Sequence, residues 1–100
     1  MEWFNQGAFW EAHEALEQIW RSVADEGEAK VLQGLIQAAA ALFHRERGNA
    51  HGVRVVGEAA LDKLAGPQHP AVEFDTERLH TELVHALQRE GRAPRLRLRH

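Results

Sequence analysis

A histidine and two glutamates lie close together near the start of the chain. The run His13-Glu14-x-x-Glu17 places an imidazole and a carboxylate four residues apart, which is about one turn of an α-helix. Histidine nitrogens and carboxylate oxygens are ligands of zinc and similar divalent ions. Zinc metallopeptidases carry a second histidine where this chain has Glu17, and their intervening glutamate acts as general base. The pattern therefore predicts His13 and Glu17 as metal ligands and Glu14 as the base.

A second set of polar residues follows in the next apolar stretch, where Gln37 and His44 share one helical stripe. If the two stretches form an antiparallel hairpin, Gln37 comes level with His13, and His44 reaches back towards the same helix. We expect His44 to complete three protein ligands, which would leave a position open for water. Gln37 and Trp10 are then candidates for binding a substrate.

The same residues have a structural interpretation that needs no metal. Buried polar groups must be hydrogen-bonded, and one network of His13, Glu17, Gln37 and His44 would satisfy its members and fix the register of two helices. We take this interpretation, in a structural or interaction module, as the first hypothesis. A metal-dependent hydrolase, with a divalent ion such as zinc, is the alternative. Whether the protein is an enzyme stays open, because no nucleotide-binding loop or nucleophile signature names a reaction.

The elements that must position these residues are helices. Apolar periodicity and capping residues predict an all-α bundle of about four helices, at about residues 7–24, 28–47, 50–65 and 76–90. Apolar residues cover most of the second helix, which should therefore be buried at the centre of the bundle. Asn5, Asn49 and Asp75 are predicted N-caps. We expect a single domain over residues 1–91 and a flexible basic tail over residues 92–100.

Three runs of the sequence form a specific combination of motifs: Phe4-Asn5-x-Gly7-x-Phe9-Trp10-Glu11-Ala12-His13-Glu14-x-Leu16-Glu17-x-x-Trp20-Arg21, Gln33-Gly34-Leu35-Ile36-Gln37-x-Ala39-Ala40-Ala41-x-x-His44 and Gly48-Asn49-x-x-Gly52. Together they resemble a small bacterial and archaeal family called domain of unknown function 309 (DUF309). The resemblance implies a compact all-helical domain, and the family is sometimes labelled a predicted metal-dependent hydrolase.

Composition limits the classes of partner. The chain has 100 residues, no cysteine and a net charge of −3. Residues 1–90 hold 15 acidic against eight basic side chains, a net of −7, and the last ten residues hold four arginines and no acid. An acidic body argues against nucleic-acid binding. The sequence has no apolar run of membrane-spanning length and no secretory signal, so we expect a cytoplasmic protein. Trp3, Phe4 and Trp10 near one end favour a homodimer.

Overall fold

The computed structural model describes residues 2–89 and 93–98, and in this part of the chain it is all-helical. Five helices follow one another: α1 (Glu2–Asn5), α2 (Phe9–Arg21), α3 (Glu26–Glu46), α4 (Ala50–Leu64) and α5 (Thr76–Arg89). The four longer ones correspond to the four predicted helices. The additional helix is α1, a single turn that precedes them.

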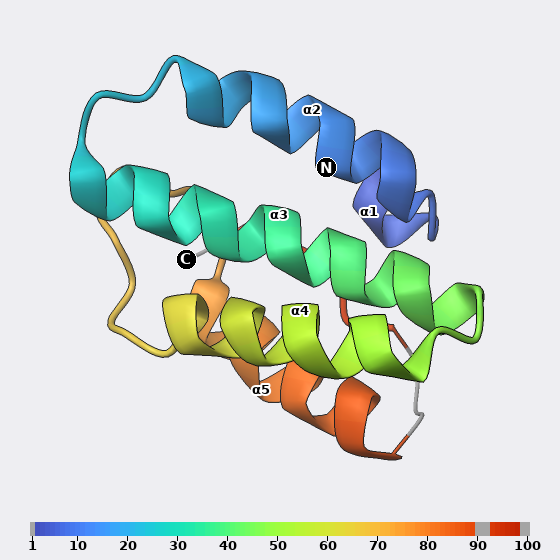
Figure 1. Ribbon diagram of the computed structural model, residues 1–100. Helices are drawn as coiled ribbons and strands as arrows, with labels where there is room; N and C mark the ends of the chain where they lie inside the picture. Colours follow the sequence, from blue (N-terminus) through green and yellow to red (C-terminus); the bar gives the residue numbers. More distant parts are fainter. Residues whose placement is uncertain (1, 90–92, 99–100) are drawn as a thin grey trace.

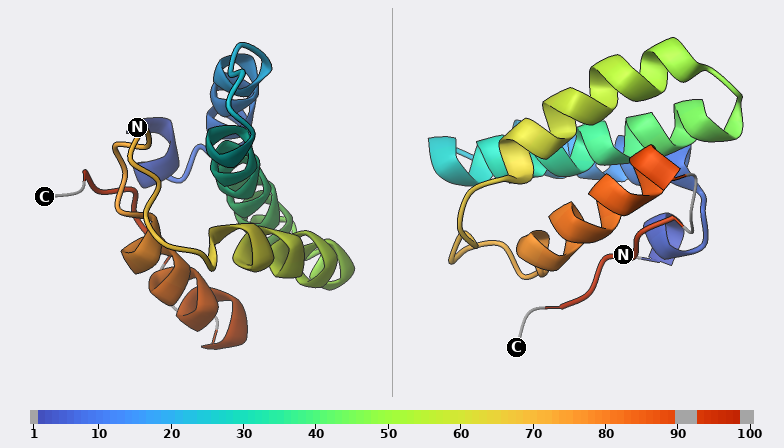
Figure 2. Two further views of the ribbon diagram at one scale, coloured as in Figure 1. Left: turned by 90° about the vertical axis from the view of Figure 1, so that its left-hand side faces the viewer. Right: turned by 90° about the horizontal axis from the view of Figure 1, so that it is seen from below.

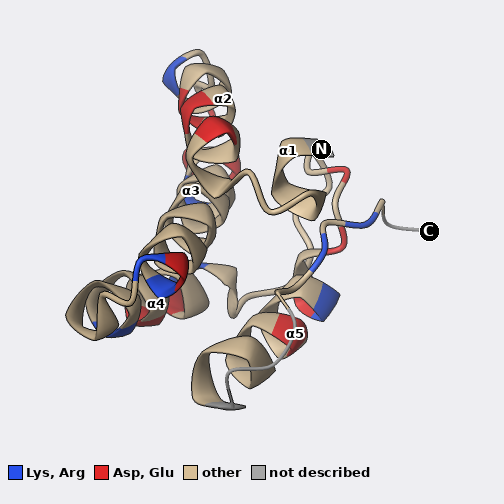
Figure 3. Ribbon diagram, turned by 90° about the vertical axis from the view of Figure 1, so that its right-hand side faces the viewer, with Lys and Arg blue, Asp and Glu red and all other residues tan. Residues whose placement is uncertain are grey.

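The longest helix, α3, lies at the centre of a layer formed by α2, α3 and α4 (Figure 1). It runs antiparallel to α2, as predicted for the first hairpin. In end view, α1, α5 and the C-terminal segment all lie on one side of this layer (Figure 3), and the view from the opposite end agrees (Figure 2). Eight residues of α3 are buried: Leu32, Gly34, Leu35, Ile36, Ala38, Ala39, Ala41 and Leu42. The helix predicted at residues 28–47 corresponds to α3, and the prediction that it is buried at the centre of the bundle is confirmed.

Small residues let α4 approach α3 closely. A Cβ atom added at Gly34 would lie 3.0 Å from the side chain of Leu64 on α4. The connection between the two helices is short because Gly48 adopts a positive φ of 71° and the side chain of Asn49 accepts a hydrogen bond from the Gly52 N–H. The cap predicted at Asn49 is therefore confirmed.

The start of α2 differs from the prediction. The helix begins at Phe9 rather than near residue 7, because Gly7 has a φ of 81° and reverses the chain after α1. Phe4 is buried and its ring meets that of Phe9 edge to face, with centroids 5.4 Å apart. Asn5 does not cap α2. Its side chain instead pairs with the backbone of Leu96, through bonds of 2.7 and 3.0 Å.

The C-terminal segment contacts the helical body. Residues 93–98 pack along the body of the protein, where Leu96 is 4 % exposed and Arg97 donates to both carboxylate oxygens of Glu82 at 2.6 and 2.7 Å. The backbone N–H of Asp75 donates to the Arg97 carbonyl at 2.7 Å. An apolar residue between two arginines gives this segment something to bury. The flexibility expected for residues 92–100 stays a prediction, and residues 92, 99 and 100 lie outside the described residues.

Candidate metal-binding site on helix α2

The three residues of the His-Glu-x-x-Glu motif lie at the edge of the buried face of α2. Phe9, Ala12 and Leu16 are buried on this helix. His13 lies beside them, with 20 % of its side chain exposed, while the values are 31 % for Glu17 and 54 % for Glu14. The apolar face fixes the rotation of the helix, so the imidazole stays half inside the protein and the carboxylates face outwards.

Their polar atoms converge on one point. His13 Nδ1 lies 3.8 Å from Glu17 Oε2 and 3.9 Å from Glu14 Oε1. One ligand atom from each of the three residues lies within 4.8 Å of the others. These separations exceed hydrogen-bond length but are compatible with three atoms that share one cation. Arg21, one turn further on, lies 3.6 Å from the other Glu17 oxygen.

Aromatic side chains hold the imidazole in place. The indole of Trp10 stacks on the ring of His13, with centroids 5.1 Å apart and planes inclined by only 8°. Trp10 also contacts the ring of Phe43 on α3, at 5.4 Å. Nearly half of Trp10 remains exposed. The tryptophan therefore forms an aromatic wall next to the cluster, which is consistent with the substrate-binding role predicted for it but does not test that role.

His44 lies elsewhere. Its Nδ1 is 3.2 Å from the side-chain nitrogen of Asn49, and its ring lies against Gly52, where an added Cβ would come within 2.7 Å. The structure thus places His44 at the junction of α3 and α4, and does not bring it into the cluster with His13, Glu14 and Glu17.

Two buried side-chain atoms in the described part of the chain, His13 Nδ1 and Gln37 Oε1, have no hydrogen-bond partner. One belongs to α2 and the other to α3. The network expected among His13, Glu17, Gln37 and His44 would have paired them, and the structure does not form it. A buried polar atom without a partner is costly unless a ligand or water completes its bonding.

Sequence reasoning missed the part played by Phe43 and Arg47. The ring of Phe43 contacts Trp10. The guanidinium carbon of Arg47 lies over the same Phe43 ring, 5.3 Å from its centroid. Neither residue was singled out from the sequence. The spacing of four residues between them was the available signal, since such pairs are neighbours on a helix surface.

Comparison with known proteins identifies the family. The model of a family described as "Domain of unknown function (DUF309)" matches residues 1–56, which include the whole of the cluster. The chain belongs to the DUF309 family. This DUF309 chain is 34% identical over 96 residues to an uncharacterized protein of Aquifex aeolicus (strain VF5). The match covers 94% of this chain but 29% of that relative, so the chain spans about three-tenths of its length.

No solved structure matches the chain. Among the described residues, no helix combines the length and the apolar character that crossing a membrane requires.

Proposed function

We propose that His13, Glu14 and Glu17 bind a divalent metal ion. The observation that carries this proposal is the buried Nδ1 of His13, which no described residue satisfies by a hydrogen bond although two carboxylate oxygens lie within 3.9 Å. One imidazole nitrogen with two carboxylate oxygens is a donor set that zinc accepts, and manganese also suits such mixed sites. The proposal replaces His44 with Glu14 as the third ligand.

The residues around the cluster have distinct roles in this proposal. Trp10 keeps the imidazole plane fixed by stacking on it, and Arg21 keeps one oxygen of Glu17 turned away from His13. Because all three ligands come from one helix face, solvent and substrate would occupy the remaining coordination positions. A bound divalent ion would supply Lewis-acid polarisation of a carbonyl or phosphoryl oxygen and a more acidic water.

Metal binding is tested by titrating the purified protein with Zn²⁺ and Mn²⁺ in a calorimeter. We expect one ion per chain, and we expect His13→Gln to weaken binding by at least about tenfold, since it removes the only nitrogen donor. Glu11→Gln is the matched control, because Glu11 is an exposed carboxylate on the same helix outside the cluster. Equal affinity in His13→Gln and in the unaltered protein would contradict the proposal.

We further propose hydrolysis as the reaction of such a site, in which the Glu14 oxygen that does not bind the metal would take a proton from water. Its greater exposure supports this role, because a general base must reach the water that it deprotonates. The substrate class would be an ester, amide or phosphoester, whose electrophilic centre a metal ion can polarise.

A second proposal is that the protein also acts as an interaction module, by forming a homodimer. It is supported by five large apolar side chains that are about half exposed or more: Trp3, Trp10, Ile19, Val55 and Leu98. Exposed aromatic surface of this kind is enriched in protein interfaces. Sedimentation equilibrium at micromolar concentration tests it, with twice the chain mass of 11.3 kDa expected. A monomer that persists over this range would rule the homodimer out.

A further inference from the structure

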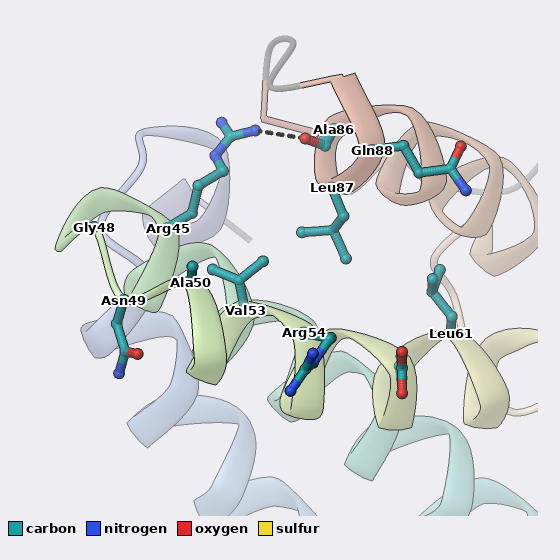
Figure 4. Close-up of a pocket in the computed structure, with 11 residues that line it drawn as sticks. Arg45, Gly48, Asn49, Ala50, Val53, Arg54, Leu61, Ala86, Leu87 and Gln88 are labelled. Carbon is teal, nitrogen blue, oxygen red and sulfur yellow. Dashed lines mark hydrogen bonds between the residues drawn. The ribbon is translucent and has the colours of Figure 1, made fainter.

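A cavity of about 500 Å³ lies between α4 and α5, away from the metal-binding cluster (Figure 4). Its size falls in the range of small-molecule sites. Leu87 on α5 and Val53 on α4 point into the space between the two helices, and Leu61 lies further along α4. Arg45 closes one end, where its guanidinium donates to the Ala86 carbonyl at 3.2 Å.

The lining changes character along its length. Arg45, Asn49 and Ala50 surround the end where α4 begins, whereas Glu58, Leu61 and Gln88 line the other end. From Val53 to Leu61 the helix rises about 12 Å, which is a length that a medium hydrocarbon chain can cover. The cavity therefore has an apolar trough in its middle, between Val53 and Leu87, with a cationic group at the Arg45 end and the carboxylate of Glu58 towards the other end.

The charges of the lining oppose those of the whole chain. Arg45 and Arg54 stand against the single carboxylate of Glu58, whereas the protein as a whole carries −3. A locally positive site on an acidic protein favours an anion, and the trough favours an apolar chain attached to it.

We infer that this cavity binds a small anionic amphiphile, a single hydrocarbon chain that ends in a carboxylate. The carboxylate lies at the end formed by Arg45 and the start of α4, with Arg54 on the rim. The chain lies between Val53 and Leu87 and points towards Leu61. The inference does not depend on the metal site, because no residue is common to the two.

Octanoate is the test ligand and 1-octanol is its neutral counterpart, both titrated into the full chain by calorimetry. We expect saturable binding of one octanoate, and affinity for 1-octanol lower by about fivefold or more. If octanoate does not bind saturably, the inference is wrong. Equal affinity for octanoate and 1-octanol would show that the cavity does not select a carboxylate.

Two variants locate the ligand. Val53→Phe fills the trough and is expected to weaken octanoate binding about tenfold or more, whereas Val55→Phe, at an exposed site two residues away, should leave it unchanged. Arg54→Gln, also at an exposed site, should weaken it about threefold, with Lys30→Gln on α3 as its control. Circular dichroism checks that each variant is folded. If Val53→Phe does not fold, the Arg54→Gln result decides. Equal octanoate binding by Val53→Phe and Val55→Phe, or by Arg54→Gln and Lys30→Gln where Val53→Phe does not fold, would overturn the inference.

Discussion

At the scale of single residues, the stack of Trp10 on His13 determines how the cluster is presented. The two rings are nearly parallel, and the indole also contacts Phe43 across the helix pair. Tilting the imidazole would separate these planes and lose the contact, so the stack fixes the plane of the His13 ring beside Glu14 and Glu17. The site is thus organised by packing before any ligand binds, which lowers the cost of ordering it.

The role of Glu14 can be separated into ligand or base with one variant. If Glu14 acts mainly as a metal ligand, Glu14→Gln should weaken Zn²⁺ binding about tenfold or more. If it also acts as the base, turnover of the variant at saturating Zn²⁺ should fall by about a hundredfold or more. Calorimetry and a panel of chromogenic esters and phosphoesters measure the two quantities. Unchanged affinity together with unchanged turnover would exclude both roles.

The cluster itself was visible in the sequence, but His44, which was expected to join it, lies elsewhere. His13, Glu14 and Glu17 are within one turn of each other, so helical spacing alone places their side chains together. His44 was predicted as a ligand from its level along the hairpin. The position of a residue along a helix does not specify which neighbouring element its side chain contacts. The side chain of Asn49, five residues after His44, contacts the imidazole of His44 instead.

At the scale of elements, the contact between α3 and α4 depends on glycines placed where side chains from a neighbouring helix arrive. Gly34 meets Leu64, and Gly52 meets the ring of His44. Capping residues are local signals, and they were sufficient to predict the limits of α4, whereas its close approach to α3 is a finding of the structure. The start of α2 was not predicted, because Asn5 has the character of a cap and only its distant partner Leu96 shows that it is used otherwise.

Replacing Gly52 by alanine should destabilise the protein. The new Cβ would lie 2.7 to 2.9 Å from three atoms of the His44 ring, so either the ring or α4 must move. We expect a loss of about 1–3 kcal/mol in the free energy of unfolding, as for other overpacked sites. Urea denaturation measures it.

Gly66→Ala is the matched control, because nothing lies within 4 Å of a Cβ added at that glycine. A stability of Gly52→Ala equal to that of Gly66→Ala would contradict the close packing of His44 on α4.

At the scale of the whole molecule, the C-terminal segment joins elements that are far apart in the chain. It contacts α1 through Asn5, the loop before α5 through Asp75, and α5 through Glu82. No pattern near residue 96 indicates these partners, because each lies well outside the range of local periodicity. Sequence reasoning therefore predicted the helices of this protein far better than the connection between its two ends.

The attachment of this segment should weaken in acid. Burial raises the pKa of Glu82, but hydrogen bonds from Arg97 and from the Arg95 N–H outweigh it, and the pKa is lowered below its ordinary value of 4.5. A carboxylate whose pKa is lowered in the folded state stabilises the protein fully at pH values above its pKa in the unfolded state. This stabilisation is lost as the pH falls through its pKa in the folded state. Glu82→Gln should therefore cost less stability at pH 3 than at pH 7.

Chemical denaturation of Glu82→Gln and the unaltered protein at both pH values measures this difference. Glu73→Gln, at an exposed carboxylate in the loop before α5, serves as the control. An equal cost of Glu82→Gln at the two pH values would show that the pair with Arg97 does not stabilise the folded state.

The bond between Asn5 and Leu96 also has a consequence for the order of folding. Its partners are 91 residues apart, whereas α2, α3 and α4 pack against neighbours in sequence. Local contacts form early and distant ones form late. During synthesis, the first three long helices can therefore associate on the ribosome while α1 still lacks its partner, and the two ends join only after residue 96 has emerged.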